Sequence, residues 1–239
     1  MKLLDVQDLD SRLDAIQHQL ATIPEAVQLA ELATRRADVD GLVRDLRIEV
    51  DDLTAEQKRA DADVEQVKAR RVRDQGMIDA GSISDPKALQ RMLGELESLQ
   101  RRISDLEDVE IDVMERLEAA QAGLDEHVAE LAEIDSQVGS LEKIRADKAH
   151  ELEMSLDSVA AERASLALEL PDDLLALYTK LRDQKGGVGA AALRRRECGG
   201  CRLTLNPSDL AAIAAAPTDE VVRCEECNRI LVRTGESGL

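Results

Sequence analysis

Apolar side chains recur every three or four residues along much of the first 170 residues, and this spacing constrains the fold more than any other feature. In the first long segment they are Leu32, Val39, Val43, Leu46, Val50, Leu53, Ala60, Val64 and Val67. A second series recurs every seven residues and is broken only by Glu110: Leu89, Leu96, Ile103, Leu117, Leu124, Leu131 and Val138. An average step of 3.5 residues is the seam of a coiled coil. Each segment is therefore expected to be a helix that packs against another helix.

The composition excludes a thick globular core. The 239 residues include no Phe and no Trp, and the only Tyr is Tyr178, whereas 34% of the residues are charged. Buried aromatic rings contribute much of the core of compact domains of this size. The remaining Leu, Ala, Val and Ile suit thin seams between helices. Arg36 and Gln57 fall at seam positions, so imperfect packing is expected there.

One strong turn signal separates the two series. The stretch DAGSISDP (79–86) combines Gly, Ser and Asp, and Asp85 can cap a helix that begins at Pro86. Two seams joined by a short loop fold back on each other, so residues 1–170 are predicted to form an antiparallel coiled-coil hairpin with its turn near 79–85. Pairing within one chain, a monomeric hairpin, is favoured over pairing between two chains.

Two further signals set the limits of the helices. Thr22-Ile-Pro-Glu25 has the form of a capping box, which predicts a short leading helix that ends near Ala21. The second arm is expected to end at Leu170-Pro171, because proline disfavours helix in the residue before it. Residues 171–239 are then expected to hold a connecting helix and a small domain.

That small domain carries all four cysteines, as two Cys-x-x-Cys pairs. Cys198, Cys201, Cys224 and Cys227 supply the four thiolates of a closed, tetrahedral structural zinc site. A redox couple of the thioredoxin type would need a βαβ context, which is absent, and would leave the second pair unexplained. One structural Zn²⁺ is the predicted cofactor, and iron with the same ligands stays an alternative.

The residues around the cysteines are typical of a β zinc ribbon. Short β-prone runs lie at 202–205, 221–223 and 229–233, and Asn206 can start a small helix. Asn228, after the last cysteine, is expected to adopt a left-handed backbone. Since the segment offers almost no apolar core, metal binding is expected to supply its folding energy, about 10–16 kcal/mol in small zinc modules.

Three stretches resemble a bacterial family of coiled-coil proteins that end in a C4-type zinc ribbon, the DUF164 group. They read DPKALQRMLGELESLQRRISDLEDVEIDVMERLE (85–118), LPDDLLALYTKLRDQKGGVGAAALRRRECGGC (170–201) and CEECNRIL (224–231). The resemblance implies a helical hairpin, a bound zinc ion and no enzymatic activity. The family's ribbon is usually described as a nucleic-acid-binding module, and some members are linked to an alternative sigma factor and to flagellar or secretion machinery. Family members usually carry Gly where this chain has Asn228.

Charge marks two candidate contact surfaces. Arginines surround the cysteines and are candidates for contact with nucleic acid or a partner: Arg194, Arg195, Arg196, Arg202, Arg223, Arg229 and Arg233. Alternatively, they neutralise the zinc–thiolate centre and pair with nearby glutamates. A second set lies at the hairpin tip, where residues 68–102 carry eight bases against five acids in a chain of net charge −19: Arg70, Arg71, Arg73, Lys87 and Arg91 are candidates for partner contact there. Charge runs are also common on ordinary solvated helices.

These features favour a non-enzymatic zinc-binding adaptor or scaffold for protein partners, in transcription or assembly machinery. The alternative is an RNA- or DNA-binding protein that uses the ribbon arginines, although no aromatic side chain is available there for bases to stack on. The sequence shows no catalytic constellation, no small-molecule site and no membrane segment, so a cytoplasmic location is expected.

Overall fold

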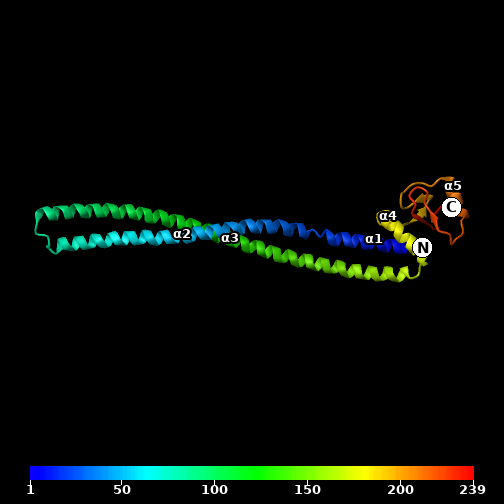
Figure 1. Ribbon diagram of the computed structural model, residues 1–239, viewed down its shortest axis with the longest axis horizontal. Helices are drawn as coiled ribbons and strands as arrows, with labels where there is room; N and C mark the ends of the chain where they lie inside the picture. Colours follow the sequence, from blue (N-terminus) through cyan, green and yellow to red (C-terminus); the bar gives the residue numbers. More distant parts are fainter. The chain divides into compact units, whose positions relative to one another are not determined.

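The computed structural model describes all residues, Met1–Leu239, and they divide into two compact units. One unit is Gln28–Leu141, and the other combines Met1–Val27 with Glu142–Leu239. The sequence suggested two domains, residues 1–170 and 171–239. That division remains a prediction. Four helices come first (Figure 1): α1 (Lys2–Ala21), α2 (Glu25–Asp79), α3 (Pro86–Ala167) and α4 (Asp172–Gln184). The ribbon follows, with β1 (Ala190–Arg194), β2 (Glu197–Cys198), α5 (Pro207–Ala215), β3 (Val222–Arg223) and β4 (Ile230–Arg233).

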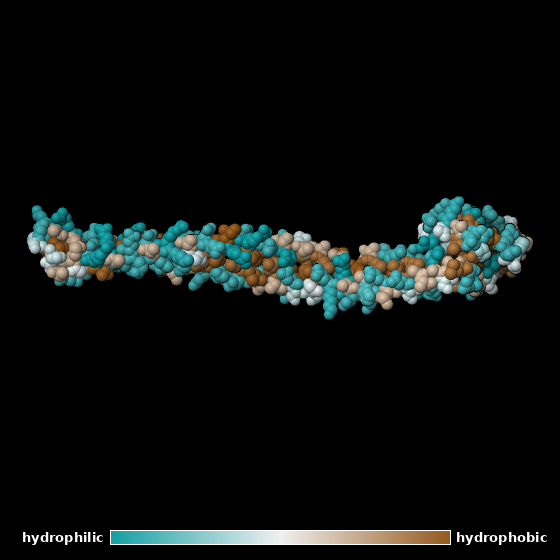
Figure 2. Space-filling model, turned by 60° about the horizontal axis from the view of Figure 1, so that its bottom comes forward, coloured by the Kyte–Doolittle hydropathy of each residue, from teal (hydrophilic) through white to brown (hydrophobic).

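Within residues 28–141, α2 and α3 run antiparallel, which confirms the predicted helical hairpin (Figure 1). The predicted seam lies on the facing sides of both helices, and its most buried members are Val39, Val43, Leu53, Val64, Leu96 and Ile103. The second helix also buries Val113 and Ile134, which the seven-residue series did not include. Ion pairs join the helices beside the seam, as between Arg70 and Glu95 at 2.6 Å. Hydrophilic side chains cover much of the visible surface of the helices (Figure 2). The hairpin is thus held by a thin apolar seam with charged flanks.

Two polar side chains at the seam show how its irregularities are accommodated. Arg36 turns outward and its Nε lies 2.6 Å from a carboxylate oxygen of Asp135 on the facing helix. His127 on α3 is half-buried, and its Nδ1 lies 3.3 Å from Glu130. Neither residue leaves a buried polar atom without a partner.

The turn between α2 and α3 follows the predicted chemistry. Gly81 has a φ of +65°, its amide donates to the carbonyl of Ile78, and the Ser82 amide donates to the carbonyl of Met77. This pattern is a Schellman cap, which ends α2. Asp85 then accepts hydrogen bonds from the backbone amides of residues 87 and 88, both at 3.2 Å, so it caps α3 as expected.

The break between α1 and α2 falls at the predicted place, but its chemistry differs from a capping box. The Thr22 hydroxyl donates to the carbonyl of His18 at 2.7 Å and so satisfies the end of α1 instead of the start of α2. The Glu25 carboxylate is bound by the ammonium group of Lys148 on α3. Glu25 therefore does not act as a capping-box acid, because its carboxylate is engaged by a lysine that is distant in sequence. A local sequence pattern does not reveal such a pair.

The ribbon is one four-stranded sheet with strand order β2-β1-β4-β3. Its centre is a parallel pairing of β1 with β4, in which Ala190 lies opposite Ile230. Alternate residues point to opposite faces of the sheet. One face carries a cluster with Leu193, Ile213 and two of the cysteines, whereas Ala190 and Ile230 belong to another cluster with Leu3, Val6, Tyr178 and Leu181. The expectation of almost no apolar core in this segment was therefore wrong, because the ribbon forms an apolar cluster of its own around the cysteines and helices α1 and α4 supply apolar partners for its other face.

Candidate metal centre and surrounding surfaces

The four cysteine sulfurs lie together on one side of the sheet. All four are within 4.8 Å of one another, with 3.8 Å between the Sγ atoms of Cys198 and Cys227 and 3.9 Å between those of Cys201 and Cys224. A tetrahedron with metal–sulfur bonds of about 2.3 Å has sulfurs about 3.8 Å apart. The set therefore fits one structural zinc ion, held by these four residues with no position left for water.

Two similar turns present the sulfurs. In each, the residue after the second cysteine donates its amide to the carbonyl of the first: Arg202 to Cys198 at 2.7 Å, and Asn228 to Cys224 at 2.8 Å. Both donors have positive φ, +59° and +64°. The sequence predicted a left-handed backbone for Asn228, and Arg202 adopts the same conformation in the first turn. Asn adopts a positive φ routinely, whereas Arg does not.

Burial makes two of these thiols, Cys198 and Cys224, poor anions without a cation. Burial raises the pKa of Cys198 and raises that of Cys224 to about 12. Burial also raises the pKa of Cys227, but hydrogen bonds from the Arg229 backbone and guanidinium outweigh it and bring the value to about 7. Zinc, when bound, stabilises the thiolates through its charge and cross-links the two turns.

The arginines near the cysteines divide by what they contact. Arg229 donates to the carbonyls of Val188 and Lys185, at 2.8 and 2.9 Å. Arg233 donates to the carbonyls of Ile213 and Ala216, at 3.1 and 2.6 Å, at the end of α5. These two guanidinium groups are therefore engaged within the protein and are not free to contact a partner.

The other five candidate arginines are exposed, namely Arg194, Arg195, Arg196, Arg202 and Arg223. Two of them still donate one hydrogen bond each to a backbone carbonyl, Arg196 to Gly238 at 3.0 Å and Arg223 to Asn228 at 3.3 Å. Arg194 lies 3.5 Å from Glu236, and no ion pair joins any arginine to the three glutamates beside the cysteines. Arg195 and Arg196 form the two-residue turn between β1 and β2, and both have positive φ, +48° and +67°. Such turns strongly prefer Asn-Gly, so two arginines here impose strain on the backbone.

The candidate tip residues lie on α2 and α3 beside the turn. Arg70 pairs with Glu95, while Arg71 is half-buried with its Nε free of any hydrogen bond. Arg73, Lys87 and Arg91 are exposed, and none of them forms an ion pair. The structure therefore keeps three free cations at the tip.

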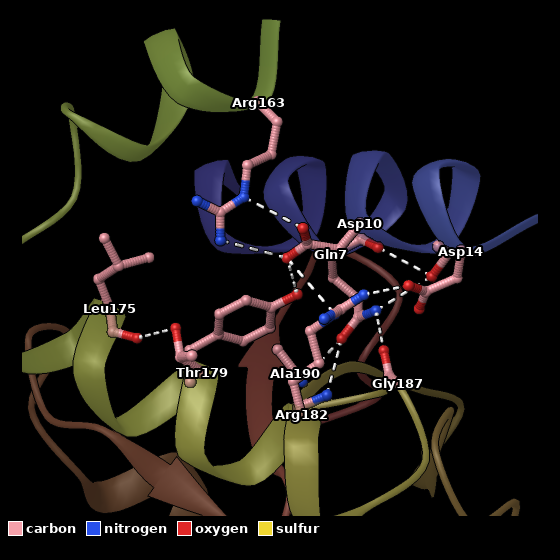
Figure 3. Close-up of polar contacts among 12 residues, drawn as sticks. Gln7, Asp10, Asp14, Arg163, Leu175, Thr179, Arg182, Gly187 and Ala190 are labelled. Atoms are coloured by element: carbon pink, nitrogen blue, oxygen red, sulfur yellow. Dashed lines mark hydrogen bonds and ion pairs between the residues drawn. The ribbon is translucent and has the colours of Figure 1, made fainter. Parts of the chain in front are cut away.

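Sequence reasoning missed a polar network that joins α1 to the segment before the ribbon (Figure 3). Buried Asp10 on α1 accepts hydrogen bonds from Tyr178 Oη at 2.7 Å and from Arg163 Nε at 3.1 Å. The Gln7 side chain donates to the carbonyl of Gly187 at 2.9 Å and accepts from the amide of Gly189 at 2.8 Å. These contacts account for the GGVG stretch at 186–189, which lies within one of the three stretches that carry the family resemblance.

The glycines of that stretch are required by close packing. Gly187 has a φ of +88°. A Cβ on Gly189 would lie 2.6 Å from the carbonyl oxygen of Tyr178 and 2.9 Å from the amide nitrogen of Arg182. Because both contacts are to backbone atoms, a larger residue would force α4 and β1 apart.

Comparison with known proteins places this architecture in a family. The model of the CT398-like coiled coil hairpin domain matches residues 6–186, and that of the C4-type zinc ribbon domain matches residues 198–231. The chain belongs to the CT398-like hairpin family. This confirms the resemblance to coiled-coil proteins with a terminal C4 ribbon, under the CT398-like name and not the DUF164 label. Neither of the two matching families is described as a family of enzymes.

Other members resemble the chain over nearly its whole length. A Mycobacterium tuberculosis protein, Rv2229c, is 31% identical over 231 residues, which cover 97% of this chain and 94% of that protein. A solved structure from Mycobacterium smegmatis has a TM-score of 0.80 and 32% identity, and the match covers 98% of this chain and 96% of that one. CT398 of Chlamydia trachomatis, with a TM-score of 0.66 and 17% identity, covers the same shares and shows the common fold. No helix of the chain carries an apolar stretch long enough to span a bilayer.

Proposed function

We propose that the protein is a cytoplasmic, non-enzymatic adaptor that joins protein partners through its hairpin and its zinc ribbon. The supporting observation is that its one cluster of metal-ligating side chains is a closed set of four cysteines. Such a shell has no open coordination position at which a substrate can be activated. The ion then serves to hold a surface in shape, and contact with other macromolecules is the role that this surface supports.

Exposed apolar side chains in both units supply contact positions for such partners. On the hairpin, Ile48 and Ile111 have 61% and 54% of their surface exposed, and on the ribbon Leu203 has 51% exposed. Scattered exposed apolar residues are normal on soluble proteins. They are nonetheless suitable sites for a direct test, because a substitution there leaves the seam and the metal set intact.

Site-specific photocrosslinking in cells of the native host tests the proposal. A photoreactive phenylalanine analogue would replace Ile48, Ile111 or Leu203, and exposed Asp108 would serve as the control position. An adaptor should give discrete protein adducts from at least one hairpin position and from the ribbon position. Adducts that disappear on nuclease treatment, or no adducts from either unit, would contradict the proposal.

A second candidate, nucleic-acid binding by the ribbon, is favoured by one observation. Three exposed arginines, at 195, 196 and 202, all hold left-handed backbone conformations that disfavour them. Strained residues of this kind concentrate at functional sites. The arginines can neutralise phosphates. The logarithm of the binding constant would then fall linearly with the logarithm of the salt concentration.

The turn itself offers a matched pair of variants. Arg195→Asn with Arg196→Gly removes both charges while giving the turn its preferred residues, so the fold should be kept or made more stable. Reversal of Arg194, Arg195 and Arg196 to Glu changes the charge further. If the ribbon binds RNA or DNA, fluorescence anisotropy should show salt-dependent binding that both variants lose. Full binding by the Asn-Gly variant would exclude these two arginines.

A further inference from the structure

We infer that the hairpin tip binds a short acidic, amphipathic segment of a protein partner. This inference deepens the proposed adaptor function, since it assigns one contact surface and the chemistry of its partner. The tip is defined here as the last three turns of α2, the connecting loop and the first two turns of α3, residues 69–92.

The first line of support is an imbalance between paired and unpaired charges. Residues 69–92 hold five basic residues against three acidic ones, and of the nearby carboxylates Asp74 and Glu95 both pair with Arg70. The cations Arg73, Lys87 and Arg91 have no carboxylate partner. The tip therefore carries free positive charge that its own acids do not neutralise.

A partly buried arginine strengthens this field. Arg71 lies at the seam with its Nε buried and without a hydrogen-bond partner. Charges that are partly withdrawn from water are screened less by salt than fully exposed ones. An acidic group that approaches the tip would thus meet the exposed cations and this additional charge.

Apolar surface lies next to the cations. A hollow of about 630 Å³ beside the end of α2 is lined by Arg70, Arg73, Asp74 and Met77, and Asp74 is paired with Arg70. Met77 is 42% exposed, and Val72 is 68% exposed. A second hollow of about 530 Å³ at the start of α3 is lined by Lys87 and Arg91 together with Gln90 and the helix-capping Asp85. Cations beside apolar side chains fit a ligand that carries both carboxylates and apolar groups.

The same features favour a protein segment over a nucleic acid. The only aromatic residue of the chain, Tyr178, is buried, so the tip has no ring on which a base can stack. Outside residues 68–102 the hairpin unit is strongly acidic. A long polyanion would be repelled by those helices within a Debye length of about 8 Å, whereas a short acidic peptide can contact the tip alone.

The test uses the full-length zinc-loaded protein and a defined probe. The probe is a fluorescein-labelled 14-residue peptide of alternating Glu and Leu, compared with a Lys–Leu peptide and a 14-nucleotide oligo(U) RNA. The tip variant is Arg73→Glu, Lys87→Glu and Arg91→Glu. The control variant is Arg47→Glu, Lys58→Glu and Arg59→Glu, which makes the same charge change at three exposed, unpaired cations of α2 away from the tip.

We expect the Glu–Leu peptide to bind the native protein and the Lys–Leu peptide not to bind it at the tip. The tip variant should weaken binding at least about tenfold, and the control variant less than about twofold. Met77→Gln with Val72→Ser should weaken binding about threefold, because the apolar contact is lost while the charge is kept. Circular dichroism would verify that all variants keep their helices.

Three results would overturn the inference. These are unchanged affinity in the tip variant, equal losses in the tip and control variants, and oligo(U) that binds the tip as tightly as the Glu–Leu peptide. Failure here would leave crosslinks from Ile48, Ile111 and Leu203 unaffected, so it is distinguishable from failure of the adaptor function itself.

Discussion

Tyr178 Oη donates a 2.7 Å hydrogen bond to the buried carboxylate of Asp10, a residue 168 positions earlier in the chain. The bond joins α4 to α1, and Arg163 brings the end of α3 to the same carboxylate. Burial and the neighbouring carboxylate both raise the pKa of Tyr178, so the phenol stays protonated and remains a donor. Asp10 is thus the common acceptor that fixes three helices of this unit.

Asp10→Asn should destabilise this unit by about 3 kcal/mol, because it breaks a buried ion pair. We expect the low end of the range for such pairs, since the side chains of Arg163 and Arg182 are partly solvated. The change leaves Arg163 without its carboxylate partner inside the protein. Urea unfolding followed by Tyr178 fluorescence measures it, since this is the only aromatic residue. Asp8→Asn, at an exposed acid of the same helix with no ion-pair partner, should cost less than about 1 kcal/mol. Equal effects of the two changes would contradict the central role of Asp10.

Gly189→Ala should destabilise the same unit by about 1–3 kcal/mol, because the new Cβ would collide with the backbone of α4. Gly139→Ala is the matched control, since its Cβ would meet nothing within 4 Å in the middle of α3. That change should instead stabilise the helix by about 0.5–1 kcal/mol. Thermal unfolding by circular dichroism and Tyr178 fluorescence would separate the two outcomes. A neutral Gly189→Ala would show that the GGVG stretch is not fixed by packing.

The hairpin and the metal set were readable from the sequence because their signals are local or periodic. The seam follows from a repeat that any partner helix must satisfy, and Asp85 with Pro86 is a capping pattern confined to a few residues. The four cysteines carry their chemistry in their spacing, and the structure brings their sulfurs together.

The remaining features depend on contacts between distant segments. Gln7 recognises the backbone at residues 187–190, and nothing near it in sequence indicates that role. Glu25 has the position of a capping-box acid, yet it binds Lys148. The Arg195-Arg196 turn contradicts turn preferences, so no propensity would have predicted it. Such pairings are set by the tertiary structure, and a single sequence does not encode them as a pattern.

The Glu25–Lys148 pair predicts a specific pH dependence. The hydrogen bond from Lys148 is the main cause that lowers the pKa of Glu25 below its ordinary value of 4.5. A lowered folded-state pKa gives stability that is fully present above the unfolded value and is lost as the pH falls through the folded value. Glu25→Gln should therefore flatten the loss of stability below pH 4.5. Glu151→Gln, at an exposed acid without an ion pair, should leave the curve unchanged, and a flattened curve there would contradict the assignment.

Removal of the metal should loosen the cysteine turns more than the helices. Cysteines 198 and 224 belong to the apolar cluster on one face of the sheet, whereas the opposite face packs on α1 and α4. A strong chelator should therefore increase amide hydrogen exchange at residues 197–228 and leave most of the helical circular dichroism intact. Collapse of the helical signal would show that the hairpin depends on the ribbon. Cys201→Ser should reproduce the effect of the chelator.

X-ray absorption at the metal edge of the purified protein would show whether the metal centre is closed. We expect one zinc per chain with four sulfur neighbours at about 2.3 Å and no oxygen or nitrogen ligand. A water or other light-atom ligand would reveal an open position and restore the possibility of chemistry at the metal. Iron in place of zinc, or a protein without metal after gentle purification, would equally contradict this expectation.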